Sequence, residues 1–199
     1  MSGGRPLGPF DLADAARHST AMALLKIARM GHPVLRHKAE AVADPTAPEI
    51  RQLLEDMLET MEDAPGIGLA APQVHVPLRM VIFHVPGHRV GEGEAALPLT
   101  RLINPVIEPL SEEKSLGWEG CLSVPGLRGI VPRFTHIRYS GVSPEGEPIR
   151  REATGMHARV VQHECDHLDG VLYPQRMTDH RLLIFDSETR HFKVMPGVA

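Results

Sequence analysis

The segment His163-Glu164-Cys165-Asp166-His167 contains the residue types needed to hold a metal ion and to move a proton. In a helix, residues four apart lie on one face, one turn above the other. His163 and His167 can therefore offer imidazole nitrogens to one ion, while Glu164 stands beside them to manage the proton of a metal-bound water. This spacing predicts a metal-dependent hydrolase.

The residues around this motif favour a helix. Thr154 can cap its beginning, and Gly170 can end it in a left-handed turn. Between them, an apolar face at helical spacing is formed by Met156, Val160, Val161 and Leu168. The two histidines lie near this face, so we expect them to be partly buried. The alternative interpretation is a pair of core histidines bonded to the backbone.

A catalytic site of this kind usually has three protein ligands and one position open to water. Tyr173 stands where the extended metzincin pattern requires a third histidine, which excludes that class. Downstream, Glu188 would give a metallopeptidase site, although no strong helical pattern surrounds it. Upstream, Cys121 would complete a Cys-His-His set. Cys165 points roughly 100° or more away from the shared histidine face, so we expect it to be a packing residue.

Composition indicates one domain and excludes some functions. The chain has 199 residues, 42% of them hydrophobic, and a formal net charge of -4 without a basic block. This balance argues against specific DNA binding, and no apolar stretch is long enough to span a membrane. We expect residues 1–23 to be a flexible N-terminal extension and residues 24–199 to be a single catalytic domain. With two cysteines and no hydrophobic signal region, the expected compartment is the cytoplasm.

Hydrophobic periodicity predicts an α+β fold. A helix is expected over about 48–63, capped by Asp44 or Thr46. Strands or extended segments are expected at 25–28, 80–83, 102–103, 131–139, 149–153 and 182–185, with a turn at 143–146. We therefore expect mostly antiparallel β-sheets around a central helix that carries the metal motif.

Three separated segments resemble the peptide deformylase family. They are Gly66-Ile67-Gly68-Leu69-Ala70-Ala71-Pro72-Gln73, Glu119-Gly120-Cys121-Leu122-Ser123 and Gln162-His163-Glu164-Cys165-Asp166-His167. Their order and spacing also fit, and the similarity runs from about Leu25 to Met177. The resemblance implies antiparallel sheets around the histidine helix. It also implies hydrolysis of the N-formyl group from the initiator methionine of newly made polypeptides, with release of formate.

The resemblance assigns roles to individual residues. The implied ligands of one divalent ion are Cys121, His163 and His167. Ferrous iron is the usual ion in the family, and zinc, nickel or cobalt can replace it. Glu164 is implied as the group that takes the water proton and returns it to the departing amine. The side chain of Gln73 and the backbone N–H of Leu122 are implied as donors to the oxyanion.

The resemblance also implies how substrate is bound. Gly68 lets its loop lie alongside the peptide as an added strand, and the candidates for the methionine slot are Ile67, Val160 and Leu122. Glu119 and Arg128 are expected to support the site by charge pairing. The expected partners are N-formylmethionyl nascent peptides near the ribosome exit, bound by a monomer or homodimer.

Two features depart from the family pattern. Trp118 stands where many members carry an acidic residue, and Gly117 stands where some carry a bulky apolar one, which leaves the shape of the methionine pocket open. The segment after Met177 does not resemble the long final helix of many bacterial members, so we expect a strand or packing on a second subunit.

A non-enzymatic relative is a further alternative, but such a protein is expected to lose Glu164 or a ligand.

Overall fold

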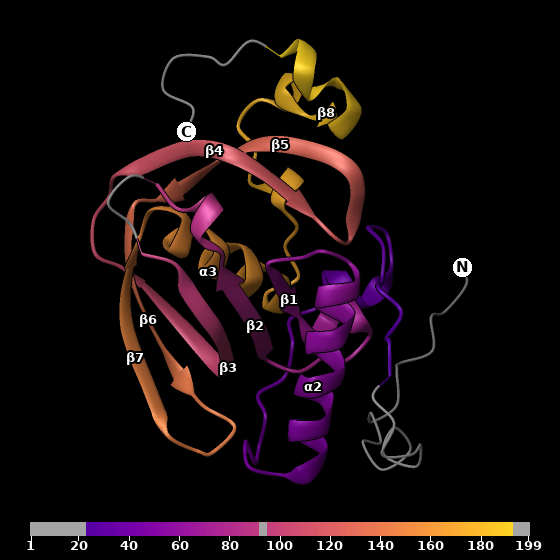
Figure 1. Cartoon of the computed structure of the whole chain (residues 1–199), viewed down its shortest axis with the longest axis vertical. Coiled ribbons are helices and arrows are strands. Elements are labelled where there is room, and N and C mark those ends of the chain that lie inside the picture. Colours follow the sequence, from indigo (N-terminus) through magenta and orange to yellow (C-terminus); the bar gives the residue numbers. More distant parts are fainter. Residues whose placement is uncertain (1–22, 92–94, 193–199) are drawn as a thin grey trace, which may run out of the picture.

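The computed structural model describes residues 23–91 and 95–192, which form two antiparallel sheets with a helix between them (Figure 1). The five-stranded sheet has the order β1-β2-β3-β6-β7, with the bounds Gly68–Ala70, Met80–Val85, Leu97–Pro109, His136–Val142 and Pro148–Thr154. The three-stranded sheet has the order β4-β5-β8, with the bounds Lys114–Cys121, Val124–Phe134 and Ile184–Phe185. Helix α3 (Gly155–Leu168) lies between the sheets, which confirms the predicted α+β fold.

Strand β2 is buried on both faces and joins the two main parts of the core. Val81, Phe83 and Val85 pack in one cluster with the apolar face of α3. The alternate residues Met80 and Ile82 pack in a second cluster with helix α2 (Pro48–Asp63). Because side chains alternate across a strand, the continuous apolar run at 80–83 supplies both clusters. Strand β2 therefore fixes α3 from one side.

Some of the predicted elements need correction. Helix α2 has the predicted range, but its N-cap is Ala47, without a side-chain capping bond, while Asp44 accepts from the backbone N of Thr46. The single strand predicted at 131–139 is wrong, because β5 ends at Phe134 and the next residues enter β6 of the other sheet. Residues 25–28, predicted as a strand or extended segment, belong to neither sheet.

Strand β4 was absent from the predicted elements, although it carries the candidate cysteine. It pairs with β5 over eight register positions from Lys114↔Phe134 to Cys121↔Val124. Gly117 and Gly120 interrupt the alternation of apolar and polar residues by which a strand is recognised in sequence. The β4–β5 pair covers the side of α3 opposite to β2 (Figure 1).

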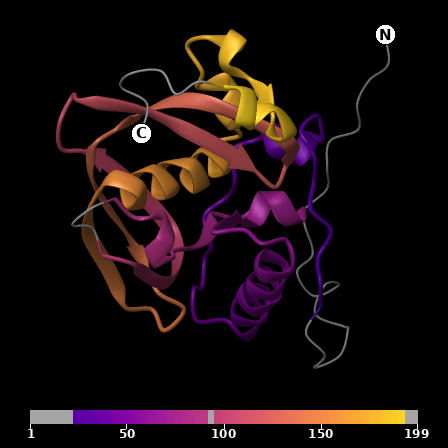
Figure 2. The same cartoon turned by 45° about the horizontal axis from the view of Figure 1, so that its top comes forward.

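The C-terminal part of the described chain packs on β5. Strand β8 confirms only the second half of the strand predicted at 182–185, because Leu182 ends a 3-10 helix (His180–Leu182). Leu127↔Phe185 is one of the pairs of β8 with β5, and Figure 2 shows this yellow C-terminal segment lying on the β4–β5 sheet. A 3-10 helix at Asp186–His191 follows. Within the described residues, no helix has the length and apolar character needed to cross a membrane. Residues 1–22 lie outside the described residues, so the expectation of a flexible extension over 1–23 stays a prediction.

Candidate metal centre

Cys121, His163 and His167 place their ligand atoms within 4.8 Å of one another. The Sγ atom of Cys121 lies 3.3 Å from Nε2 of His167. The cysteine ends β4, and the histidines lie one turn apart on the face of α3 that meets this strand. A thiolate with two imidazoles suits zinc and other divalent first-row metals, so the donor set fits the ion that the sequence predicts.

The hairpin between β4 and β5 brings the sulfur to the helix. The register shifts between Gly120 and Cys121, so that Cys121 pairs with Val124 at the end of the ladder. A shift of this kind bends the strand and redirects its side chains. Gly126 adopts a φ of 76°, a conformation that favours glycine, as β5 begins.

Glu119 fixes the orientation of His163. The Nδ1–H of His163 donates to Oε2 of Glu119 at 2.8 Å, which leaves Nε2 for an ion. Burial alone would lower the pKa of His163, but the Cys121 sulfur and the Glu119 carboxylate raise it above its ordinary value. Burial lowers the pKa of His167 well below its ordinary value, which favours the neutral imidazole that a metal requires.

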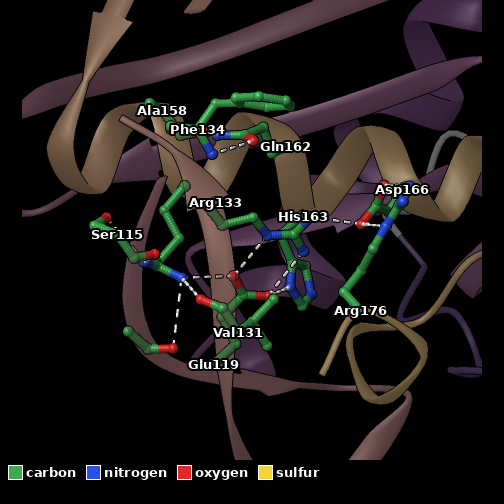
Figure 3. A network of polar contacts seen from close by, with 12 residues as sticks. Ser115, Glu119, Val131, Arg133, Phe134, Ala158, Gln162, His163, Asp166 and Arg176 are labelled. Carbon is green, nitrogen blue, oxygen red and sulfur yellow. Dashed lines mark hydrogen bonds and ion pairs between the residues drawn. The ribbon is translucent and has the colours of Figure 1, made fainter. Parts of the chain in front are cut away.

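A buried chain of charged groups extends from His163 to the surface (Figure 3). Glu119 accepts from Nε and Nη2 of Arg133 at 2.8 and 3.0 Å, and Nη1 of Arg133 donates to Asp166 at 2.6 Å. Asp166 also accepts from Nη2 of Arg176 at 2.7 Å. Burial would raise the pKa of Glu119, but Arg133 and His163 hold it well below its usual range. The network therefore joins β4, β5 and α3 through charge-assisted hydrogen bonds.

One of the predicted ionic partners in this network is wrong. The predicted support role of Glu119 agrees with its contacts, but its ionic partners are Arg133 and Arg159. Arg128 instead pairs with Asp186 at the surface. Asp166, to which no role was given, is buried and paired. The proximity of these residues arises from strand pairing across the fold, and no local sequence spacing predicts it.

Glu164 is buried beside the metal ligands at 4% exposure. Burial raises its pKa to about 7, so that near neutral pH its carboxyl group can both take up and release a proton. A Cβ atom at Gly68 would collide with the Glu164 carboxylate. Gly68 was predicted to allow close approach of substrate, and the structure adds that its missing side chain leaves room for Glu164.

Gln73 belongs to the site and not to the surface. It is 1% exposed, and its Nε2 lies 3.5 Å from Sγ of Cys121 and donates to Oγ of Ser123 at 3.1 Å. Its Oε1 accepts from the backbone N of Ala70 at 2.9 Å, which fixes the amide orientation. Leu122 follows the cysteine in the turn between β4 and β5.

A cavity of about 900 Å³ opens onto these groups. Of the predicted site residues, it is lined by Ile67, Gly68, Gln73, Cys121, Leu122, Val160, His163 and Glu164. His167 is the exception, because it lies behind the lining at 1% exposure. The same cavity is also lined by Trp118, Met156 and Arg159, so apolar side chains and a guanidinium lie in it together with the candidate metal ligands.

The two rival ligands do not join the site. Cys165 is 6% exposed and packs in the core cluster shared by α3 and β2, as predicted for a packing residue. Glu188 lies in the 3-10 helix at Asp186–His191, where its carboxylate is 3.9 Å from His191. Its carboxylate is not a member of the Cys121-His163-His167 group, so the metallopeptidase interpretation loses its third ligand.

Comparison with known proteins identifies the family. Residues 24–182 match the family described as polypeptide deformylase. Peptide deformylase 1 of Bordetella pertussis is 58% identical over 153 residues, covering 77% of this chain and 87% of that protein. Peptide deformylase 2 of Pseudomonas putida is 53% identical over 154 residues, covering 77% and 83%.

Solved structures agree with this result. A peptide deformylase from Synechococcus elongatus in complex with actinonin has a TM-score of 0.70 and 38% identity, covering 79% of this chain and 80% of that one. A class I type b peptide deformylase from Acinetobacter baumannii with Met-Ala-Ser bound has a TM-score of 0.73 and 33% identity, covering 79% and 100%. With this fold, and with a cysteine and two histidines converging as a metal site, the chain belongs to the peptide deformylase family.

Proposed function

We propose that this chain hydrolyses the N-formyl group of formyl-methionyl peptides, with Glu164 as the proton carrier. Cys121, His163 and His167 would hold a divalent ion, and that ion would supply the Lewis acidity that makes water nucleophilic near neutral pH. Glu164 takes the proton of the attacking water and passes it to the departing amine, which leaves formate and a free amino terminus. A carboxyl group with a pKa of about 7 suits both transfers.

The oxyanion formed during attack needs hydrogen-bond donors that are already in position. The side-chain amide of Gln73 is fixed at both ends, and its nitrogen lies beside the ligand sulfur. We assign this amide and the backbone N–H of Leu122 to the oxyanion. One such donor is typically worth about 10²–10³ in rate.

One observation carries the proposal most directly. Two metal ligands, a buried carboxyl group and a fixed amide line one cavity, with the third ligand His167 directly behind it, although these residues come from three separate segments of the chain. Ile67, Val160 and Leu122 line the same cavity and offer an apolar surface for the methionine side chain. Gly68 is in the edge strand β1, where a peptide can add as a further strand.

The test is formate release from formyl-Met-Ala-Ser after anaerobic purification and metal analysis. We expect Glu164→Gln to keep its metal and to lose nearly all turnover, because the amide cannot carry the proton. Cys121→Ser should lose most of its metal as well as its activity. Cys165→Ser is the matched control, since this cysteine lies outside the ligand set. A Glu164→Gln variant as fast as the parent would refute the role of Glu164.

The identity of the metal ion, the source of the substrates, the compartment and the extent of the domain are also proposed from family membership. Ferrous iron is the ion that we expect in the cell, with zinc, nickel or cobalt able to occupy the site. The substrates are nascent chains near the ribosome exit, so the expected compartment is the cytoplasm. Residues 24–199 are proposed as one catalytic domain. Metal analysis of the anaerobically isolated protein distinguishes the ions.

A further inference from the structure

Arg159 joins helix α3 to strand β4 beside the metal ligands. It is 8% exposed and lies one helical turn before His163. Its Nη1 donates to Oε1 of Glu119 at 3.1 Å and to the backbone oxygen of Val131 at 2.9 Å. Its Nη2 donates to the backbone oxygen of Ser115 at 3.0 Å. One side chain of the histidine helix therefore binds both strands of the cysteine hairpin.

Gly117 leaves the space that this guanidinium occupies. A Cβ atom at Gly117 would lie 2.6 Å from both Cζ and Nη2 of Arg159, closer than real Cβ contacts. The backbone oxygen of Gly117 also lies 3.4 Å from Nη1. Gly117 has no unusual φ that would require glycine. The absence of a side chain at this position is therefore explained by the approach of Arg159 to the strand.

We propose that Arg159 is a positioning residue, which sets β4 against α3 and so sets the distance between the Cys121 sulfur and the two imidazoles. The inference rests on the proposed metal site and adds a residue to its support. The guanidinium reaches the site by two routes. It contacts the carboxylate that orients His163, and it contacts the backbone of the strand that ends in Cys121.

The chemistry of arginine suits this role better than that of lysine. A guanidinium offers five N–H donors in a fixed plane, so it can bind several carbonyl oxygens and a carboxylate at once. An ammonium group offers three donors from a single point and cannot reach both strands in the same way. Glu119 balances the buried charge of Arg159, which is why the pair is tolerated next to a cavity.

Metal affinity measures this role without reference to deformylation. In a chelator competition with Zn²⁺, we expect Arg159→Met to bind 10–100-fold more weakly than the parent, the range typical for residues that orient metal ligands. Arg159→Lys should fall between the two. The Co²⁺-loaded variants should show a weakened thiolate-to-cobalt absorption band. Arg138→Met is the matched control, because Arg138 pairs with Glu108 and Glu152 on the exposed side of the five-stranded sheet.

A double-mutant cycle separates this role from general stabilisation. Gly117→Ala should weaken Zn²⁺ binding nearly as much as Arg159→Met, because the new methyl group displaces the guanidinium. In the Arg159→Met background, Gly117→Ala should change the Zn²⁺ affinity little, since the flexible thioether can move aside. The double variant is therefore expected to be no worse than either single variant.

The outcomes distinguish this inference from the proposed function. If the parent binds no divalent metal, the proposed function fails. If the parent binds metal and Arg159→Met binds it equally well with an unchanged cobalt spectrum, the positioning role fails. Additive losses in the cycle would also overturn the role, because they would show that Gly117 and Arg159 act independently.

Discussion

Replacing Glu119 with glutamine tests how the buried charges support the metal centre. Glu119 is 6% exposed and accepts four hydrogen bonds, two from Arg133, one from Arg159 and one from His163. A glutamine of the same shape keeps one oxygen, which can accept two of the four. Its NH₂ group must then face the other two donors.

The expected loss in the free energy of unfolding follows from the number of hydrogen bonds that are lost. Hydrogen bonds to charged groups contribute about 1.5–3 kcal/mol each, so losing two of them costs about 3–6 kcal/mol. Breaking a buried ion pair by removing one partner costs about 3–5 kcal/mol, in the same range. The remaining oxygen can accept from either His163 or Arg159 but not from both, so the metal ligands lose one of their supports and metal affinity should fall by about 10–100-fold. Both losses are expected in Glu119→Gln.

Two measurements check this prediction. Urea unfolding of the metal-free protein gives the change in the free energy of unfolding, and chelator competition with Zn²⁺ gives the change in affinity. Glu152→Gln is the matched control, because Glu152 is an exposed partner of Arg138 and solvent screens such pairs, so that they contribute little to stability. A Glu119→Gln variant within about 1 kcal/mol of the parent, with unchanged affinity, would refute the argument.

Three further predictions test separate parts of the structure. Gly68→Ala should keep its metal but lower kcat at least tenfold, because the methyl group displaces Glu164; formate release and metal analysis check this. In the native metal-free protein, iodoacetamide should modify Cys121 and spare the buried Cys165, as peptide mass spectrometry would show, and equal labelling would contradict the packing. Met57→Ala should destabilise the fold by about 2–5 kcal/mol in urea unfolding while Zn²⁺ affinity stays unchanged, since this side chain is fully buried in the α2 cluster.

The chemistry of the site could be predicted because metal ligands belong to few residue types. His163 and His167 are four apart on a helix, and this spacing alone places them on one face. Helix α2 was also predictable, since its apolar residues follow the helical period. The choice of Cys121 over Glu188 rested on the family resemblance, and the convergence of the ligand atoms agrees with it.

The supporting contacts could not be predicted, because their partners are set by strand pairing. Arg133 meets Glu119 and Asp166 only when β5 pairs with β4 and packs against α3, and Arg128 was predicted instead. Both arginines are on β5, where side chains alternate between faces; Arg133 is buried, whereas Arg128 is half exposed. A one-residue error in register would exchange such faces, and the boundary at Phe134 was itself misplaced.

The backbone oxygens that Arg159 binds explain how β4 is fixed to α3 although Gly117 places no side chain against the helix. Gly117 removes the side-chain packing that usually holds a strand on a helix, yet the guanidinium in its place binds the backbone oxygens of Ser115 and Val131 directly. Hydrogen bonds to a backbone are directional, whereas apolar contacts tolerate sliding. A strand that must deliver a sulfur atom to two imidazoles with little tolerance therefore gains from polar attachment. The polar attachment of β4 accounts for a buried charge beside the metal ligands, where burial alone would disfavour it.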